Sequence, residues 1–371
     1  MEEENRMGQD SVNKINESIF QDKPVDEVIE EEKRLLLSVD LKPIQGDRFQ
    51  PTGFPNIGPA EYEADSTKML IVESSQSMAN RLEMTCWDFN TNNIIKELNG
   101  IPYINVKNGK GKFLTSSILE AHRLASPYIL DSYRLGDIAG KERLMGEIVK
   151  EELLENGNNA QLEIIEINRL VKLLDKYDFN SLLHGVFLAK KEISGGRYHL
   201  QRALTAFVEA KNVKEVISGG TKIDILNAKG EKINGDLDEN LDVKKESERG
   251  RSNIIYPRME YTGDITAYFN LNIEQIKNYD ICKNEKTLLL VLALFKIKRL
   301  LDSGLRFRTA CDLKVEGEIK SNIKLKGGDL PSEDYLLNLI KDLINKIKLN
   351  NENLGNNFSP FELTYKGSKE K

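Results

Sequence analysis

The spacing of apolar residues is the feature of this sequence that most limits its fold. Apolar runs of strand length alternate with stretches whose apolar residues recur at helical spacing. The predicted strands cover residues 35–41, 69–73, 101–106, 203–210, 265–273 and 306–315, and the predicted helices cover 74–86, 115–130, 285–301 and 332–348. Strands interleaved with helices and interrupted by insertions are typical of an α+β domain with a small central sheet.

Two polar segments stand apart from this pattern. Residues 1–34 hold eleven acids and five bases, which accounts for the whole net charge of −6, and we interpret them as an acidic, mobile arm. Residues 225–253 contain few large apolar side chains, and we interpret them as a projecting hairpin or loop with a turn at Lys229-Gly230.

Composition excludes several classes of protein. The chain has 371 residues and is 39% hydrophobic, so it can bury a core without covalent cross-links. We expect no disulfide framework, metal or cofactor, because the cysteines and histidines lie far apart and lack the spacing of metal ligands: Cys86, Cys282, Cys311, His122, His184 and His199.

No membrane segment is predicted. The longest apolar run, Leu288 to Phe295, is much shorter than the roughly 20 residues of a spanning helix. The N-terminus lacks the basic and apolar regions of a signal peptide. We therefore expect a cytoplasmic protein.

Motifs of common enzymes are missing. The segment at 108–117 lacks the P-loop spacing, and the sequence has no GxSxG elbow. A metabolic enzyme with an unrecognised pocket stays open as an alternative, and it predicts a small oligomer that is free of nucleic acid.

Arginines beside aromatic residues recur in predicted strands and loops. They occur at Arg48-Phe49, at Arg197-Tyr198-His199, around Arg258 between Tyr256 and Tyr261, and at Arg306-Phe307-Arg308. Guanidinium groups neutralise phosphates, and aromatic rings stack on bases, so this pairing suits single-stranded RNA. Salt bridges within the protein are the competing interpretation. Nine bases against four acids between Lys296 and Lys326 also favour a basic surface.

A second candidate is the polar turn that opens the helix after Glu73. Ser74 or Ser75 can cap this helix, and its free backbone N–H groups suit a phosphate. Capping does not explain why Gln76, Ser77, Asn80 and Arg81 follow within two turns.

Several separated motifs resemble the backbone subunit of type I-G (formerly I-U) CRISPR surveillance complexes, a branch of the repeat-associated RNA-binding superfamily. They are QGDRFQPTGFPNIG (45–58), LIVESSQSMANRLE (70–83), SSILEAHRLASPYI (116–129), FVEAKNV with SGGTKID (207–224), YPRMEYT with ITAYFNL (256–271) and LLDSGLRFRTACDL (300–313). The resemblance extends over residues 35 to 315.

The resemblance implies an RNA-recognition-motif-like (ferredoxin-like) palm over residues 35–330. A helical region would be inserted at about 140–190, the hairpin or loop at about 225–253 would project, and 331–371 would form a C-terminal helix and tail. The implied partners are guide crRNA, target DNA through the guide, copies of the same chain and other effector subunits. Copies would stack along one guide RNA.

We therefore predict a non-catalytic RNA-binding scaffold. Its predicted contacts are Arg48, Ser75, Gln76, Arg81, Arg197, Arg202, Arg258, Arg306 and Arg308. The alternative from the same superfamily is an RNA endonuclease with His199 as general acid-base, or Asp236 and Asp238 as metal-assisted catalysts.

Overall fold

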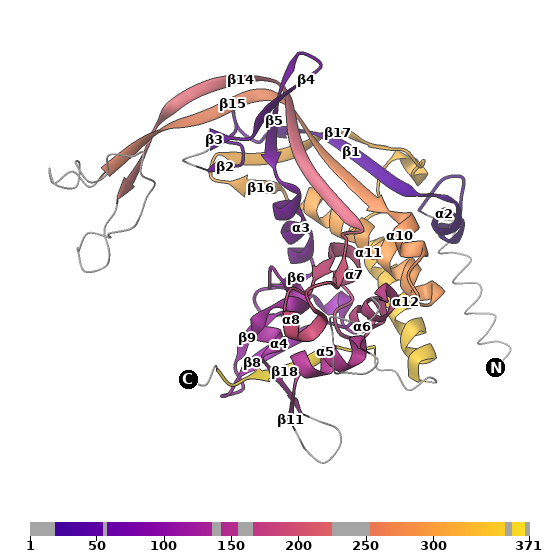
Figure 1. The fold of residues 1–371 in the computed structure, drawn as a ribbon. Helices are drawn as coiled ribbons and strands as arrows, with labels where there is room; N and C mark the ends of the chain where they lie inside the picture. Colours follow the sequence, from indigo (N-terminus) through magenta and orange to yellow (C-terminus); the bar gives the residue numbers. More distant parts are fainter. Residues whose placement is uncertain are drawn as a thin grey trace.

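A curled antiparallel sheet of seven strands dominates the fold (Figure 1). The computed structural model describes residues 19–54, 58–135, 142–154, 166–224, 253–352 and 358–367. The strand order is β16-β17-β1-β15-β14-β5-β4. Their bounds are β1 (Arg34–Pro43), β4 (Glu61–Ala64), β5 (Thr67–Glu73), β14 (Leu204–Asp224), β15 (Asn253–Asn272), β16 (Leu305–Arg308) and β17 (Cys311–Ser321). The mixed α+β class is confirmed.

Strand alternation explains which face of this sheet is buried. On β1, every second side chain is buried, and each of these pairs across the ladder with a buried residue of β15. Leu37 lies opposite Phe269, and Val39 lies opposite Ala267. The intervening residues, such as Ser38 and Asp40, are half-buried on the other face.

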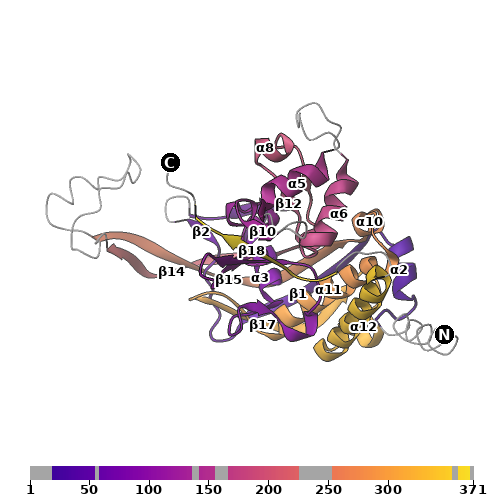
Figure 2. The same cartoon turned by 90° about the horizontal axis from the view of Figure 1, so that it is seen from below.

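Helices cover the apolar face, so that the sheet arches over them (Figure 1). They are α2 (Val25–Glu31), α3 (Ser75–Met84), α10 (Ile273–Lys277), α11 (Lys283–Asp302) and α12 (Glu333–Glu352). Helix α11 is buried on all sides from Thr287 to Ile297, because other elements surround it. Figure 2 shows α12 running alongside α11.

A second sheet lies at the far end of α3 from the large sheet (Figure 1). Its order is β11-β10-β18-β8-β9, and β18 runs parallel to β8. The strands are β8 (Ile104–Asn108), β9 (Phe113–Ser116), β10 (Tyr133–Leu135), β11 (Glu142–Leu144) and β18 (Phe361–Tyr365). The expected C-terminal tail therefore contributes a strand to the region inserted between β5 and β14.

The region between β5 and β14 also holds short helices and turns. They are α4 (Pro127–Leu130), α5 (Met145–Leu153), α6 (Ile167–Tyr177), α7 (Ser181–His184) and α8 (Lys191–Ser194), with 3-10 turns η1 (Lys96–Leu98) and η2 (Arg123–Ala125). Of these, α4, α5 and α6 contact the second sheet. Short strand pairs complete the described elements: β2 (Gly53–Phe54) with β3 (Gly58–Pro59), β6 (Trp87–Asp88) with β7 (Asn93–Ile94), and β12 (Val186–Phe187) with β13 (His199–Leu200), beside a further 3-10 turn η3 (Lys326–Gly328).

The acidic N-terminal segment is not wholly an arm. Ile19 and Phe20 are buried, and Phe20 forms a β-bridge with Leu325. The apolar side of α2 is buried as well. The prediction of an arm was based on the net charge of residues 1–34 and did not consider these apolar residues, which are part of the core. Residues 1–18 lie outside the described part of the chain.

Two further expectations differ from the structure. The predicted helix over 115–130 consists of the end of β9, η2 and α4, because Pro127 favours an extended residue before it and begins α4 instead. The predicted strand over 306–315 is two strands, β16 and β17, joined by a tight turn at Thr309-Ala310. Of the predicted projecting element at 225–253, residues 225–252 lie outside the described residues, and Asn253 begins β15.

A partly buried carboxyl on α6, that of Asp175, lies within electrostatic reach of Glu285 on α11. Burial raises the pKa of Asp175 on α6 to about 8, and Glu285 on α11 adds repulsion. Among the described residues, none donates a hydrogen bond to Asp175 Oδ1. The folded state thus holds this proton more tightly than the unfolded chain, so stability is lost as the pH rises from about 4 towards 8.

The substitution Asp175→Asn should remove the loss of stability that occurs as the pH rises. At pH 8 the variant should exceed the wild type in free energy of unfolding by at least about 1.4 kcal/mol, which corresponds to one pKa unit, and the difference should shrink towards pH 5. Urea unfolding at several pH values measures it. Asp280→Asn is the control, because a hydrogen bond from Lys172 lowers the pKa of Asp280. A constant difference between Asp175→Asn and wild type at all pH values would contradict the prediction.

Candidate nucleic-acid interface

Helix α3 starts directly at the end of β5, as the sequence predicted. Ser74 is its N-cap and accepts a hydrogen bond from the Ser77 backbone N–H at 3.3 Å. Ser75 is half-buried in the first turn, and Gln76 is exposed. The helix therefore presents a polar first turn beside the edge of the large sheet.

Glu73 organises this corner of the molecule. Its carboxylate is 2% exposed and accepts hydrogen bonds from Ser77 Oγ, Arg81 Nε and Arg308 Nη2. The Arg81 bond measures 3.3 Å. Residues distant in the sequence thus meet at one buried acid, and we call Glu73, Arg81 and Arg308 the Glu73 cluster.

The two arginines also hold backbone carbonyl groups of neighbouring segments. Arg81 donates to the carbonyl oxygens of Arg306 (3.2 Å) and Phe307 (2.8 Å), and its guanidinium lies 4.9 Å from the centre of the Phe307 ring. Arg308 donates to the carbonyl oxygens of Gln50 (2.8 Å) and Val72 (3.0 Å). These bonds connect α3, β5, β16 and the loop after β1, which brings opposite edges of the curled sheet together.

The Glu73 cluster carries one negative and two positive charges. The side chains of Arg81 and Arg308 remain 30% and 23% exposed. Both side chains are therefore partly exposed, and the three groups together have an excess of positive charge that suits an anion.

Two further predicted arginines lie at the edges of this corner. Arg306 is exposed on β16, and no described residue forms an ion pair with its side chain. Arg48 is 62% exposed and forms a 2.7 Å ion pair with Glu260, which is 5% exposed. Arg306 is thus the more available of the two for an external anion.

The remaining predicted contacts lie elsewhere. Arg202 is half-buried near Glu83 and Arg123, at the other end of α3, and burial followed by repulsion from Arg123 lowers its pKa. Arg197 is half-buried in the segment between α8 and β13. The backbone of Arg258 pairs with Gly219 in the β14–β15 ribbon, and its side chain lies outside the described part. The structure therefore does not bring Arg197 and Arg202 to the Glu73 cluster.

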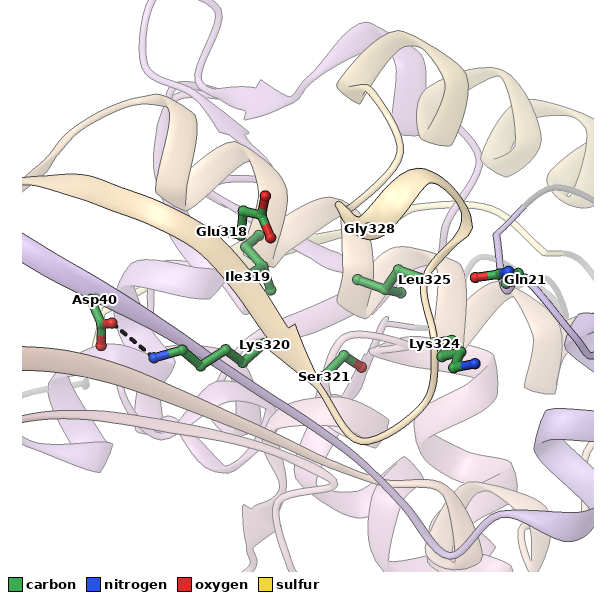
Figure 3. Close-up of a pocket in the computed structure, with 9 residues that line it drawn as sticks. All are labelled: Gln21, Asp40, Glu318, Ile319, Lys320, Ser321, Lys324, Leu325 and Gly328. Atoms are coloured by element: carbon green, nitrogen blue, oxygen red, sulfur yellow. Dashed lines mark hydrogen bonds and ion pairs between the residues drawn. The ribbon is translucent and has the colours of Figure 1, made fainter.

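The basic stretch from Lys296 to Lys326 does not form one basic surface. Lys296 is fully buried, Lys298 pairs with Asp302 at 3.0 Å, and Lys320 pairs with Asp40 at 2.9 Å. Figure 3 shows the Lys320 pair beside a hollow of about 620 Å³ near the end of β17. Lysines and acids line this hollow in equal number, so it has no net charge.

A buried polar network fastens the other end of α3. Glu83 accepts two hydrogen bonds from Arg123, from Nε at 2.7 Å and from Nη2 at 2.6 Å. Nearby, buried Lys296 Nζ lies 2.6 Å from Asn180 Oδ1 and 2.8 Å from His184 Nε2. The inserted region is thereby tied to both α3 and α11.

Sequence reasoning missed Glu73 and the Glu83–Arg123 pair. One feature of the sequence could have indicated Glu73. It is a charged residue at the end of an apolar strand, directly before a capped helix. Glu83 and Arg123 are 40 residues apart in sequence, and nothing local indicates their contact.

The residues named for the alternative RNA endonuclease lie partly inside and partly outside the described part of the chain. His199 is exposed, with Nδ1 3.3 Å from the Arg197 carbonyl oxygen, and no described carboxylate pairs with it. Asp236 and Asp238 lie outside the described residues. Among those residues, no three His, Cys, Asp or Glu side chains gather as metal ligands, and no helix is long and apolar enough to cross a membrane.

Comparison with known families finds a family model that matches part of the chain. Residues 35–215 match the family model described as CRISPR-associated protein GSU0053. The matched segment holds β1, the loop after it, β5, α3 and the inserted region up to the first half of β14. It therefore includes Glu73 and Arg81.

Solved structures with detectable similarity were also found. Csc2 from Thermofilum pendens is 9% identical with a TM-score of 0.32, and 87% of this chain and 77% of that chain are covered. A chain of a structure titled "CRISPR RNA-guided surveillance complex, pre-nicking" is 12% identical with a TM-score of 0.36, and 86% and 87% are covered. No curated protein matches the chain.

Proposed function

We propose that this chain is a non-catalytic, guide-RNA-binding backbone subunit of a type I CRISPR effector complex, of subtype I-G. The observation that carries the proposal is the positively charged Glu73 cluster beside the exposed Arg306 and Gln76, in a chain whose residues 35–215 match a CRISPR-associated family. Sequence-independent binding of a single strand needs cations that follow the phosphates.

The topology of the large sheet fits an RNA-recognition-motif-like palm. Its four central strands run in the order β17-β1-β15-β14, which by sequence is fourth, first, third, second. Helix α3 lies in the long crossover from β1 to β14. Helix α11 lies in the crossover from β15 to β16 and β17. This order of strands and helices supports the proposed ferredoxin-like palm.

The proposal includes the expected partners. The guide would pair with target DNA while the protein holds the RNA backbone, and copies of the chain would stack along the guide with other effector subunits in the cytoplasm. Arg81 and Arg308 would serve mainly to position α3 and β16, and exposed Arg306, Arg48 and Gln76 would reach the RNA.

Removal of the two most exposed arginines tests the RNA-binding surface. For Arg48→Gln/Arg306→Gln, the slope of log affinity against log salt should fall by about 1.4, since each lost phosphate contact on a single strand contributes about 0.7. At 150 mM salt this corresponds to an affinity about tenfold lower. Fluorescence anisotropy with a labelled 30-nucleotide RNA measures both quantities.

The matched control is Arg143→Gln/Lys298→Gln. It removes the same charge from residues that pair with Glu151 and Asp302 away from the corner. Equal slopes for the two double variants would overturn the assignment of the site. A wild-type chain that binds no RNA, either alone or after coexpression with a CRISPR array, would overturn the proposed function itself.

A further inference from the structure

A groove between α3 and α11 continues from the Glu73 cluster. Its volume is about 510 Å³. It is lined by Ser77, Asn80, Arg81, Met84 and Thr85 of α3, and by Arg299, Leu300, Ser303 and Gly304 at the end of α11. Two arginines and no acidic residue line it. Arg81 belongs to both the groove and the Glu73 cluster, so the two surfaces are continuous.

The α3 side of the groove explains why this helix is so polar. Residues 77, 80, 81, 84 and 85 recur every three to four positions and therefore share one face of the helix. The buried face is formed by Met78, Ala79 and Leu82 instead. Asn80 and Arg81, which capping does not require, thus face the groove and not the core.

Donors in the groove remain available for a ligand. A guanidinium has five N–H donors, and the hydrogen bonds of Arg81 to Glu73, Arg306 and Phe307 use three of them. Asn80 is exposed. By contrast, the hydroxyl of Thr85 donates to the Leu82 carbonyl oxygen at 2.7 Å.

Arg299 supplies the second charge. Its side chain is 33% exposed, lies 5.7 Å from the centre of the Phe295 ring and is 3.5 Å from Glu333 Oε1. That ion pair is long and half-exposed, so it constrains the guanidinium weakly. The C-terminal dipole of α11 contributes only about −0.5 of a charge, which two arginines outweigh.

The residues that line the α3–α11 groove suit a ligand that has both an anionic group and an apolar group. Charged N–H donors suit a phosphate oxygen, while Met84 and Leu300 offer apolar surface to a sugar or base. We propose that the α3–α11 groove binds one nucleotide of the single-stranded RNA, with its phosphate between Arg81 and Arg299 and an additional bond from Asn80. This inference rests on the proposed function and extends the RNA path beyond the residues that the sequence indicated.

The test uses the full chain and the same labelled RNA. Asn80→Ala/Arg299→Gln should lower the salt slope by about 0.7, the value for one phosphate, and lower affinity about fourfold at 150 mM salt. The control Asn90→Ala/Lys298→Gln likewise removes one amide and one positive charge, at residues that do not line the groove, and should leave binding unchanged.

A second variant separates binding from packing. Glu333→Gln removes the partner of Arg299 and leaves the arginine in place, so RNA binding should stay equal or become tighter. If Arg299 acts only by fastening α12, Glu333→Gln should weaken RNA binding as Arg299→Gln does, and that result would overturn the proposal.

The outcomes also separate this inference from the proposed function. If wild type binds RNA and Arg48→Gln/Arg306→Gln weakens it, an unchanged slope for Asn80→Ala/Arg299→Gln would reject the groove alone. If the chain binds no RNA, but a peptide of the acidic residues 1–18 binds and Arg299→Gln abolishes that binding, the groove takes an acidic protein segment and the proposal is wrong.

Discussion

Replacing Arg123 by Met is expected to lower the free energy of unfolding by about 3–5 kcal/mol, the usual cost of breaking a buried ion pair from one side. The Arg123 side chain is 7% exposed and the Glu83 side chain 4%. Without Arg123, the carboxylate stays buried without its two hydrogen bonds. Burial already raises the pKa of Glu83, so the orphaned carboxyl would bind a proton.

Urea unfolding of the double variant Glu83→Leu/Arg123→Met provides the control. Because apolar side chains of similar volume leave no buried charge, this variant should regain most of the lost stability. A double variant as unstable as Arg123→Met would show that the loss comes from elsewhere.

Glu73→Ala is expected to destabilise the chain by about 3 kcal/mol and also to weaken RNA binding. Hydrogen bonds to charged groups contribute about 1.5–3 kcal/mol each, and Glu73 accepts them from Arg81 and Arg308. Removal of an acid makes the corner more positive, so simple electrostatics predicts tighter RNA binding. We expect the opposite, because α3 and β16 would no longer be held together.

Glu215→Ala is the matched control for charge. Glu215 is 44% exposed and pairs with Lys68, so its loss should leave stability nearly unchanged and RNA binding equal or slightly tighter. Urea unfolding and RNA anisotropy measure both variants under the same conditions. If Glu73→Ala binds RNA more tightly than Glu215→Ala, the Glu73 cluster acts by charge alone and our account of its positioning role is wrong.

The arginines show how far sequence reasoning reached. The sequence placed Arg81 on a capped helix and Arg306 and Arg308 on a strand, and the structure confirms these elements. Strand alternation also predicted that Phe307 is turned towards the core, and its side chain is buried. The partners of Arg81 and Arg308 were not predictable, because Glu73 and Arg308 are 235 residues apart and meet only when the sheet curls.

The local sequence pattern predicted the main helices and strands of this protein. The tertiary structure decided which of its charged residues are buried, paired or exposed. The Ser74 cap, the long α11 helix and the alternation of β1 depend on neighbours in sequence, so they could be predicted. Lys296 lies in a basic stretch, yet α11 is surrounded on all sides and the lysine is buried against Asn180 and His184. Ile19 and Phe20 lie in an acidic segment but join the core. Burial and ion pairing depend on which distant segments pack together, and composition does not contain that information.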